Sequence, residues 1–187
     1  MDYIETWKEV MQRPSDFYRK MPTTGGYAEP LTFAAISYII YGLLIAIFNR
    51  GMMEDMYGGM GVRGFGFSTI ITIAISIPIM GIISLFIGAA VLYLIYKLLG
   101  GTGTYEGTVR FMSYATAVQV LSWIPIIGFI VGLYRIYLYI VGGMFVHNIS
   151  MGRSAIAVVL PYLVGFLLVM ILALLIFSTV AISDTFI

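Results

Sequence analysis

The chain has 187 residues, of which 60% are hydrophobic and only 10% are charged. A soluble domain needs about a quarter of its residues charged, so this composition excludes a water-soluble fold. The formal net charge of +1 excludes a strongly basic nucleic-acid-binding surface and an acidic tail. Because the chain has no cysteine, disulfides, thiolate metal sites and cysteine nucleophiles are excluded as well. We therefore expect an all-α, polytopic helical bundle in a membrane.

Residues 1–29 form the only substantial polar segment before the first long apolar run. Their apolar side chains recur at helical spacing before and after a proline, which predicts one or two short amphipathic helices. In one interpretation these helices lie in the lipid headgroup layer, with Trp7 and Phe17 inserted and Arg19 and Lys20 near lipid phosphates. In the other, the helices pack on the protein itself.

The remaining residues, 30–187, read as one membrane domain. Five apolar stretches are each long enough, or nearly so, to cross a hydrocarbon core of about 30 Å. The second stretch is about 50 Å long as one helix, so we expect a kink or break at Pro78, with residues 67–77 as an interfacial or tilted piece. The third is the shortest and the most polar. The five stretches are approximately residues 31–48, 67–99, 108–124, 126–147 and 154–182.

The distribution of lysine and arginine predicts the orientation of these spans. With the N-terminus in the cytoplasm, the cytoplasmic segments hold seven of these residues before and between the spans, and the opposite side holds only Arg50 and Arg63. Cytoplasmic loops are enriched in positive charge. We therefore expect five spans with the N-terminus inside and the C-terminus outside.

Arg135 is the most conspicuous polar residue because it lies near the middle of the fourth predicted span. An arginine at the bilayer centre costs about 2.5–3.5 kcal/mol on insertion scales, which makes it a functional-site hypothesis. Its candidate partners, which complete an intramembrane polar site, are Gln119, Ser122 and Tyr137. The alternatives are a structural pairing or an arginine that extends its flexible stem toward the interface.

Two pairs of small residues are spaced for close helix packing. Gly128 and Gly132 form a GxxxG pair in the fourth span, and Ser84 and Gly88 form a similar pair in the second. Small residues four apart let two membrane helices approach closely. We expect these pairs to serve helix packing within the chain, and a homo-oligomer interface is the alternative.

The sequence contains no recognisable catalytic or metal-binding pattern. The methionine-rich connection 50–66 could suggest copper(I), but it has neither cysteine nor histidine. The glycine-rich turn at residues 100–103 lacks the Lys-Ser or Lys-Thr pair of a phosphate-binding loop. The single histidine, His147, is interpreted as an interfacial residue. We therefore expect a non-enzymatic protein that needs no metal or cofactor and binds no nucleic acid.

Several short motifs resemble one known family. They are GGTGTYEGT at 100–108, FMSYATA at 111–117, Ile-Pro at 124–125, RPSDFY at 13–18 and SMGR at 150–153. In this order they are similar to the glycine turn, the central helix, the following step and two flanking motifs of the Yip domain family. The resemblance covers most of residues 11–175 and points to a prokaryotic-type member.

This resemblance implies a five-span multi-pass protein of the cell membrane. Eukaryotic members interact with prenylated Rab-type GTPases and act in vesicle trafficking and membrane shaping. Residues 1–29 are shorter than the cytosolic region of those members and lack its Asp-Leu-Tyr-Gly-Pro-like motif, so a small GTPase is implied only distantly. Two hypotheses follow: a membrane-organising or adaptor protein that contacts lipids, partners or copies of itself, or a small transporter or channel in which Arg135 holds an anionic ligand.

Overall fold

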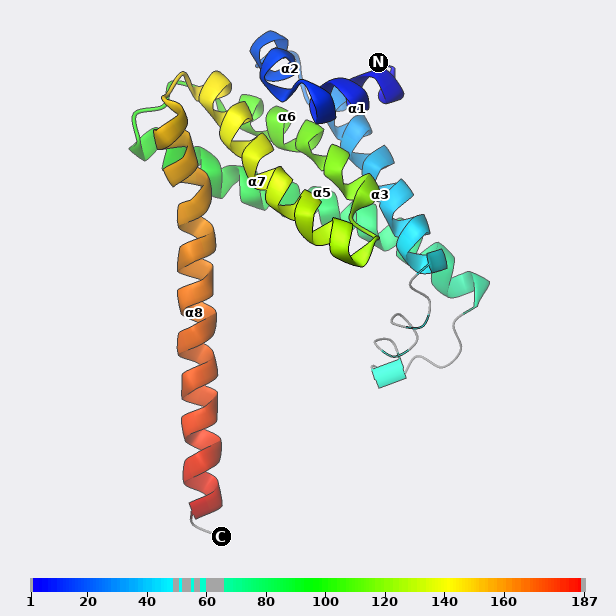
Figure 1. The fold of residues 1–187 in the computed structure, drawn as a ribbon, viewed down its shortest axis with the longest axis vertical. Coiled ribbons are helices and arrows are strands. Elements are labelled where there is room, and N and C mark those ends of the chain that lie inside the picture. The colour runs from blue at the N-terminus through cyan, green and yellow to red at the C-terminus, as the bar shows by residue number, and fades with distance from the viewer. Residues whose placement is uncertain (1, 49–50, 52–54, 56–57, 60–65, 186–187) are drawn as a thin grey trace.

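The computed structural model describes residues 2–48, 51, 55, 58–59 and 66–185, and only the backbone of residues 178–185. Within these ranges the regular elements are all helices (Figure 1). They are α1 (Tyr3–Gln12), α2 (Pro14–Lys20), α3 (Ala28–Phe48), α5 (Phe67–Leu98), α6 (Tyr105–Ala115), the 3-10 helix η1 (Thr116–Leu121), α7 (Pro125–His147) and α8 (Met151–Thr185). The methionine-rich connection falls largely outside the described residues.

Four helices are long and apolar enough to cross a membrane: α3, α5, α7 and α8. They coincide with four of the five stretches that the sequence predicts. The third stretch, 108–124, is not among them, so the structure supports a multi-pass helical protein without confirming five spans.

The proline in the second predicted span does not break the helix. α5 runs without interruption from Phe67 to Leu98, with Pro78 inside it. Pro78 is buried, and α5 packs along α3, where the Tyr38 ring would lie only 2.8 Å from a Cβ at Gly81. A proline removes one backbone hydrogen bond from a helix. Since α3 is packed this closely against α5, the expected separate piece at 67–77 is instead part of one long helix.

The short helix α6 lies at the centre of the molecule. It packs against α3, α5 and α7, and all residues from Gly107 to Ala115 are buried. Its α-helical geometry ends at Ala115 and continues as η1, which packs against α3 and α7 and leads directly to Pro125. A short, buried helix with polar residues therefore occupies the third predicted stretch, which the sequence marks as the shortest and most polar of the five.

The N-terminal helices α1 and α2 lie across one end of this bundle (Figure 1). α1 begins at Asp2, whose side chain accepts hydrogen bonds from the backbone N–H groups of Ile4 and Glu5. This arrangement is a standard N-cap. α2 begins at Pro14, a favourable first helical residue. The two short helices predicted from the apolar spacing are both present.

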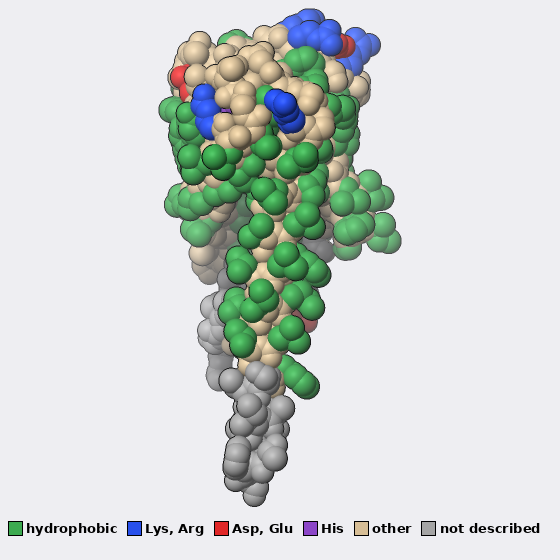
Figure 2. All heavy atoms as spheres, turned by 90° about the vertical axis from the view of Figure 1, so that its left-hand side faces the viewer, with side chains coloured by type: hydrophobic (Ala, Val, Ile, Leu, Met, Phe, Trp, Pro, Cys, Tyr) green, Lys and Arg blue, Asp and Glu red, His purple; other side chains and the backbone are tan. Residues whose placement is uncertain are grey.

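α8 extends away from the bundle over most of its length (Figure 1). Its first turns pack through Ser154, Ala157 and Val158, which are buried. Beyond Pro161 every described side chain, from Tyr162 to Phe177, is exposed. In Figure 2 these apolar side chains cover α8, whereas the lysine and arginine side chains visible on that face lie at the end of the molecule occupied by α1 and α2. The exposed apolar surface is what a hydrocarbon environment requires.

Candidate functional site

The glycine-rich turn before α6 folds around His147. The backbone N–H of Thr102 donates to the His147 carbonyl at 2.9 Å. A Cβ at Gly103 would lie 2.8 Å from Nδ1 of His147, and a Cβ at Gly101 would lie 3.2 Å from the same atom. The absence of side chains at these two glycines is therefore what allows the turn to close on the imidazole, which is fully buried.

One hydroxyl contacts both the start of α6 and the imidazole. The Thr108 hydroxyl oxygen lies 3.0 Å from the Thr104 carbonyl oxygen and 2.9 Å from Nε2 of His147, so Nε2 is the hydrogen-bonded nitrogen of the ring. Nδ1 is buried without a partner among the described residues. The ring also stacks on Tyr96, with ring centroids 4.2 Å apart.

Arg110 joins α6 to the connection between α2 and α3. Its side chain is only 2% exposed, and its Nε and Nη1 donate to the carbonyls of Pro22 and Gly26 at 2.6 and 2.5 Å. Glu106, one turn earlier, accepts a hydrogen bond of 2.6 Å from the Gly26 N–H. Charge-assisted hydrogen bonds of this kind are among the stronger ones in proteins. α6 therefore holds the segment that leads from the N-terminal helices into the membrane.

Aromatic side chains hold α1 and α2 on the bundle. Trp7 donates from Nε1 to the Ala117 carbonyl at 2.8 Å, and Tyr134 of α7 donates to the Met11 carbonyl at 2.8 Å. Tyr18 is 1% exposed and donates to the Phe111 carbonyl at 3.3 Å, and burial raises the pKa of its hydroxyl well above the ordinary value. We call α1 and α2, held in this way, the N-terminal cap.

These contacts place the four residues predicted for the lipid interface. Trp7 and Phe17 are partly buried and pack against the protein core, as in the second interpretation of the sequence. Arg19 is exposed and its guanidinium lies 5.4 Å from the centre of the Phe145 ring, within cation–π range. Lys20 is exposed. A contact of these side chains with lipid stays a prediction.

The predicted intramembrane polar site is only partly assembled. Arg135 is half-buried and lies near the hydroxyls of Tyr38, Tyr41 and Tyr139. Its Nε is buried without a hydrogen-bond partner among the described residues. The tyrosines come from α3 and from α7 itself.

The three predicted partners of Arg135 lie in different environments. Gln119 of η1 is half-buried, and its Oε1 is buried without a hydrogen-bond partner among the described residues. Ser122 donates to the Val118 carbonyl at 3.0 Å. Tyr137 is 37% exposed, and its ring lies against Tyr134 rather than in the interior. Among the described residues, none of the three forms a hydrogen bond with Arg135.

The two pairs of small residues differ in their surroundings. A Cβ at Gly128 would lie 2.6 Å from the carbonyl oxygen of Ser122, in the connection before α7, and a Cβ at Gly132 would meet nothing within 4 Å. Gly88, in contrast, faces Met112 of α6 at 3.3 Å. With Ser84 it lines a cavity of about 290 Å³ between α5, α6, α7 and α8. Their role in packing stays a prediction.

Sequence reasoning missed the two residues around which the buried polar groups gather. Arg110 was counted only as a loop cation and His147 only as an interfacial residue. The available signal was their neighbourhood: Arg110 follows an N-capping Thr104 by six residues, on a helix with an apolar and a polar face. The glycines at 101 and 103 were interpreted as a turn, and the structure adds that they and Gly107 allow a close approach to α7.

The fold and these polar contacts define an all-helical, multi-pass membrane protein with a structured N-terminal cap. A family model for the Yip1 domain matches residues 8–175. The chain therefore belongs to the Yip1 domain family, as the resemblance in its motifs indicated. This family is associated with membrane trafficking and interacts with small GTPases and membranes. No curated protein and no solved structure matches the chain.

Proposed function

We propose that this chain is a non-enzymatic membrane-organising or adaptor protein that presents its N-terminal cap to partners in the cytoplasm. The observation that supports this proposal most directly is the docking of α1 on the bundle through Trp7 and Tyr134. Docking leaves an outer face of α1 whose charged and polar side chains, Glu5, Lys8, Glu9 and Gln12, are all exposed. A fixed helix with a charged outer face is a suitable surface for a protein partner.

The proposed orientation places this cap in the cytoplasm. Three connections lie together at one end of the bundle, because Arg110 contacts residues 22–26 and Thr102 contacts His147. Lys97 and Arg153 flank two of these connections, and the cap supplies four more cations. Positive charge concentrated at one end favours the cytoplasmic side.

We also propose that α6 and η1 complete a third crossing, which gives five. The two elements together are 17 residues long, 11 in α6 and 6 in η1, or about 28 Å at the rises of the two helix types. This length is close to the hydrocarbon thickness of about 30 Å. The surrounding helices supply the apolar contact to lipid, so α6 itself can be polar.

Recruitment to reconstituted vesicles tests the adaptor proposal. Proteoliposomes that hold the full chain are expected to bind a prenylated small GTPase more than protein-free vesicles do. Lys8→Glu should lower this binding several-fold, since it reverses a charge on the outer face of α1. Lys97→Glu, at the same end but on α5, is the matched control. Binding no higher than to protein-free vesicles in any nucleotide state would contradict the proposal.

A transporter or channel for an anionic ligand is the second candidate, and the unpartnered Nε of Arg135 favours it. A charged donor buried without a partner is costly unless a ligand or a displaced polar group satisfies it. The test is flux of a panel of inorganic and organic anions into the same proteoliposomes. Flux that Arg135→Gln abolishes would establish this function, and absence of flux for the whole panel would exclude it.

A further inference from the structure

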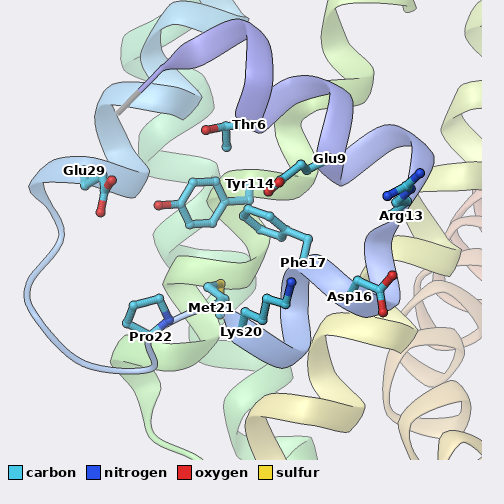
Figure 3. A pocket seen from close by; sticks show the side chains of 10 residues that line it. All are labelled: Thr6, Glu9, Arg13, Asp16, Phe17, Lys20, Met21, Pro22, Glu29 and Tyr114. Atoms are coloured by element: carbon cyan, nitrogen blue, oxygen red, sulfur yellow. The ribbon is translucent and has the colours of Figure 1, made fainter.

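A surface cavity of about 360 Å³ opens between the N-terminal cap, the first turn of α3 and α6. Its volume is within the lower part of the range of pockets that bind small ligands. Figure 3 shows that its side chains come from four separate elements and converge on one hollow. The contacts that dock the cap on the bundle therefore also build a pocket, which we call the cap pocket.

The floor of the cap pocket is aromatic. The Tyr114 ring meets the Phe17 ring edge to face, with centroids 4.9 Å apart and an angle of 73°. Tyr114 is only 4% exposed. Its hydroxyl has no hydrogen-bond partner among the described residues, but the hydroxyl oxygen is not fully buried. In Figure 3 this hydroxyl points into the hollow toward Glu29. A mostly buried side chain thus offers one free polar atom to whatever occupies the pocket.

Acidic and basic side chains both line the cap pocket: Glu9, Asp16 and Glu29 on one hand, and Arg13 and Lys20 on the other. Glu29 and Glu9 lie on two sides of the Tyr114 ring, Lys20 lies near Phe17, and Asp16 lies on the same side of the pocket as Arg13 (Figure 3). A primary ammonium can donate to two carboxylates and a hydroxyl oxygen while it contacts an aromatic ring. The Lys20 ammonium suits a phosphate. The pattern is therefore complementary to a compact zwitterion.

The position of the pocket relative to the membrane favours a lipid headgroup as this zwitterionic ligand. Glu29 lies in the first turn of α3, immediately before the uncharged stretch 31–48 that is expected to enter the hydrocarbon. The pocket is thus at the depth of lipid headgroups. Ethanolamine phospholipids carry a primary ammonium and a phosphate a few bonds apart, at this depth and in large excess.

We infer that the cap pocket binds the phosphoethanolamine headgroup of a membrane lipid. The ammonium lies between Glu9, Glu29 and the Tyr114 ring and hydroxyl, and the phosphate lies toward Lys20. A choline headgroup fits less well, because its quaternary ammonium has no N–H to donate. This selectivity goes beyond the adaptor function, which needs a membrane but no particular lipid.

Native mass spectrometry of the full chain in detergent tests this inference. The protein is equilibrated with equal amounts of phosphatidylethanolamine, phosphatidylcholine and phosphatidylglycerol, and the retained lipid is counted. The wild type is expected to retain phosphatidylethanolamine several-fold over the other two. Glu29→Gln should lower that retention about tenfold, as expected for loss of one charge-assisted hydrogen bond, and Tyr114→Phe should lower it less.

Glu5→Gln is the matched control, since Glu5 is an exposed carboxylate of α1 outside the cap pocket. It should leave lipid retention unchanged. Equal retention of all three lipids by the wild type, or equal effects of Glu29→Gln and Glu5→Gln, would overturn the inference. Preferential binding of soluble glycerophosphoethanolamine or of a lysine-rich peptide over the lipid would overturn it too, because the occupant would then not be a membrane component.

Discussion

Two arginines of this protein lie in the interior of the bundle, and the fold treats them differently. Arg110 on α6 is 2% exposed and donates to two backbone carbonyls at 2.6 and 2.5 Å. Arg135 on α7 is half-buried, and its Nε has no partner in the described structure. The more deeply buried charge is therefore the better satisfied one. Burial of a charge is stable when oxygens are already in place to receive it.

The difference between the two arginines shows which end of the bundle is held together by more hydrogen bonds. At the end that holds Arg110, the cap, the glycine turn and α6 are joined by hydrogen bonds between separate elements. Near Arg135 the neighbours are tyrosine hydroxyls of α3 and α7. We expect mutations at the Arg110 end to affect folding and mutations at Arg135 to spare it.

Arg110→Ala should have the largest effect. It removes two charge-assisted hydrogen bonds and leaves two carbonyls unsatisfied, which costs about 3 kcal/mol or more of unfolding free energy. The melting temperature of the full chain in detergent is expected to fall accordingly, and the 22–26 connection should become sensitive to proteases. Arg153→Ala, at an exposed arginine of the same end, is the control. Equal melting temperatures for both variants would refute the comparison.

Gly143→Ala and Gly132→Ala compare two positions of α7. A Cβ at Gly143 would overlap the Tyr96 hydroxyl, whereas a Cβ at Gly132 meets open space. Overpacking of a tight contact costs about 1–3 kcal/mol, so Gly143→Ala should lower the melting temperature. Gly132→Ala should leave it unchanged or raise it slightly, since alanine favours helix. A destabilising Gly132→Ala would instead point to a contact between two copies of the chain.

Trp7→Phe tests the docking of the cap with a smaller expected effect. The variant keeps an aromatic ring and loses the hydrogen bond from Nε1 to the Ala117 carbonyl, which is worth about 1 kcal/mol. Hydrogen exchange of α1 amides should accelerate while that of α7 stays constant. Unchanged exchange in α1 would mean that the indole does not hold the cap.

Arg135→Gln should have the smallest effect on stability. Since Nε of Arg135 has no partner to lose, the change in unfolding free energy is expected to stay within about 1 kcal/mol. Thermal melting in detergent measures it. A loss as large as that of Arg110→Ala would show that the two arginines are equally important to the fold and would remove the contrast between them.

The long helices were predictable from the sequence because hydrocarbon imposes one simple requirement. A run of about 20 apolar residues predicts a membrane span whatever the neighbouring segments are. The helices α3, α7 and α8 begin within three residues of the starts of the predicted stretches 31–48, 126–147 and 154–182. Of the kink or break expected at Pro78, the break is wrong, since α5 is continuous and packs closely on α3, whereas the kink stays a prediction. Tertiary contacts of this kind cannot be predicted from the hydropathy of the sequence.

The polar centre was much harder to predict. His147 follows the glycine turn at 100–103 by 44 or more residues, and Arg110 contacts a connection that lies 84 or more residues before it. Arg135 was conspicuous because it is a charged residue within an apolar run. Such a pattern compares a residue with its neighbours in sequence and does not show which distant residues it contacts. The glycines carried the stronger signal, since Gly101 and Gly103 have close neighbours that no side chain would tolerate.

α8 is attached to the bundle near its beginning, where the Ser154 hydroxyl donates to the Ile140 carbonyl at 2.6 Å. Its 35 residues make a rod of about 52 Å, longer than the hydrocarbon is thick. A helix in excess of the bilayer accommodates the mismatch by tilting. Because the side chains from Tyr162 to Phe177 are exposed, we expect the tilt of this part of α8 to follow the thickness of the surrounding bilayer.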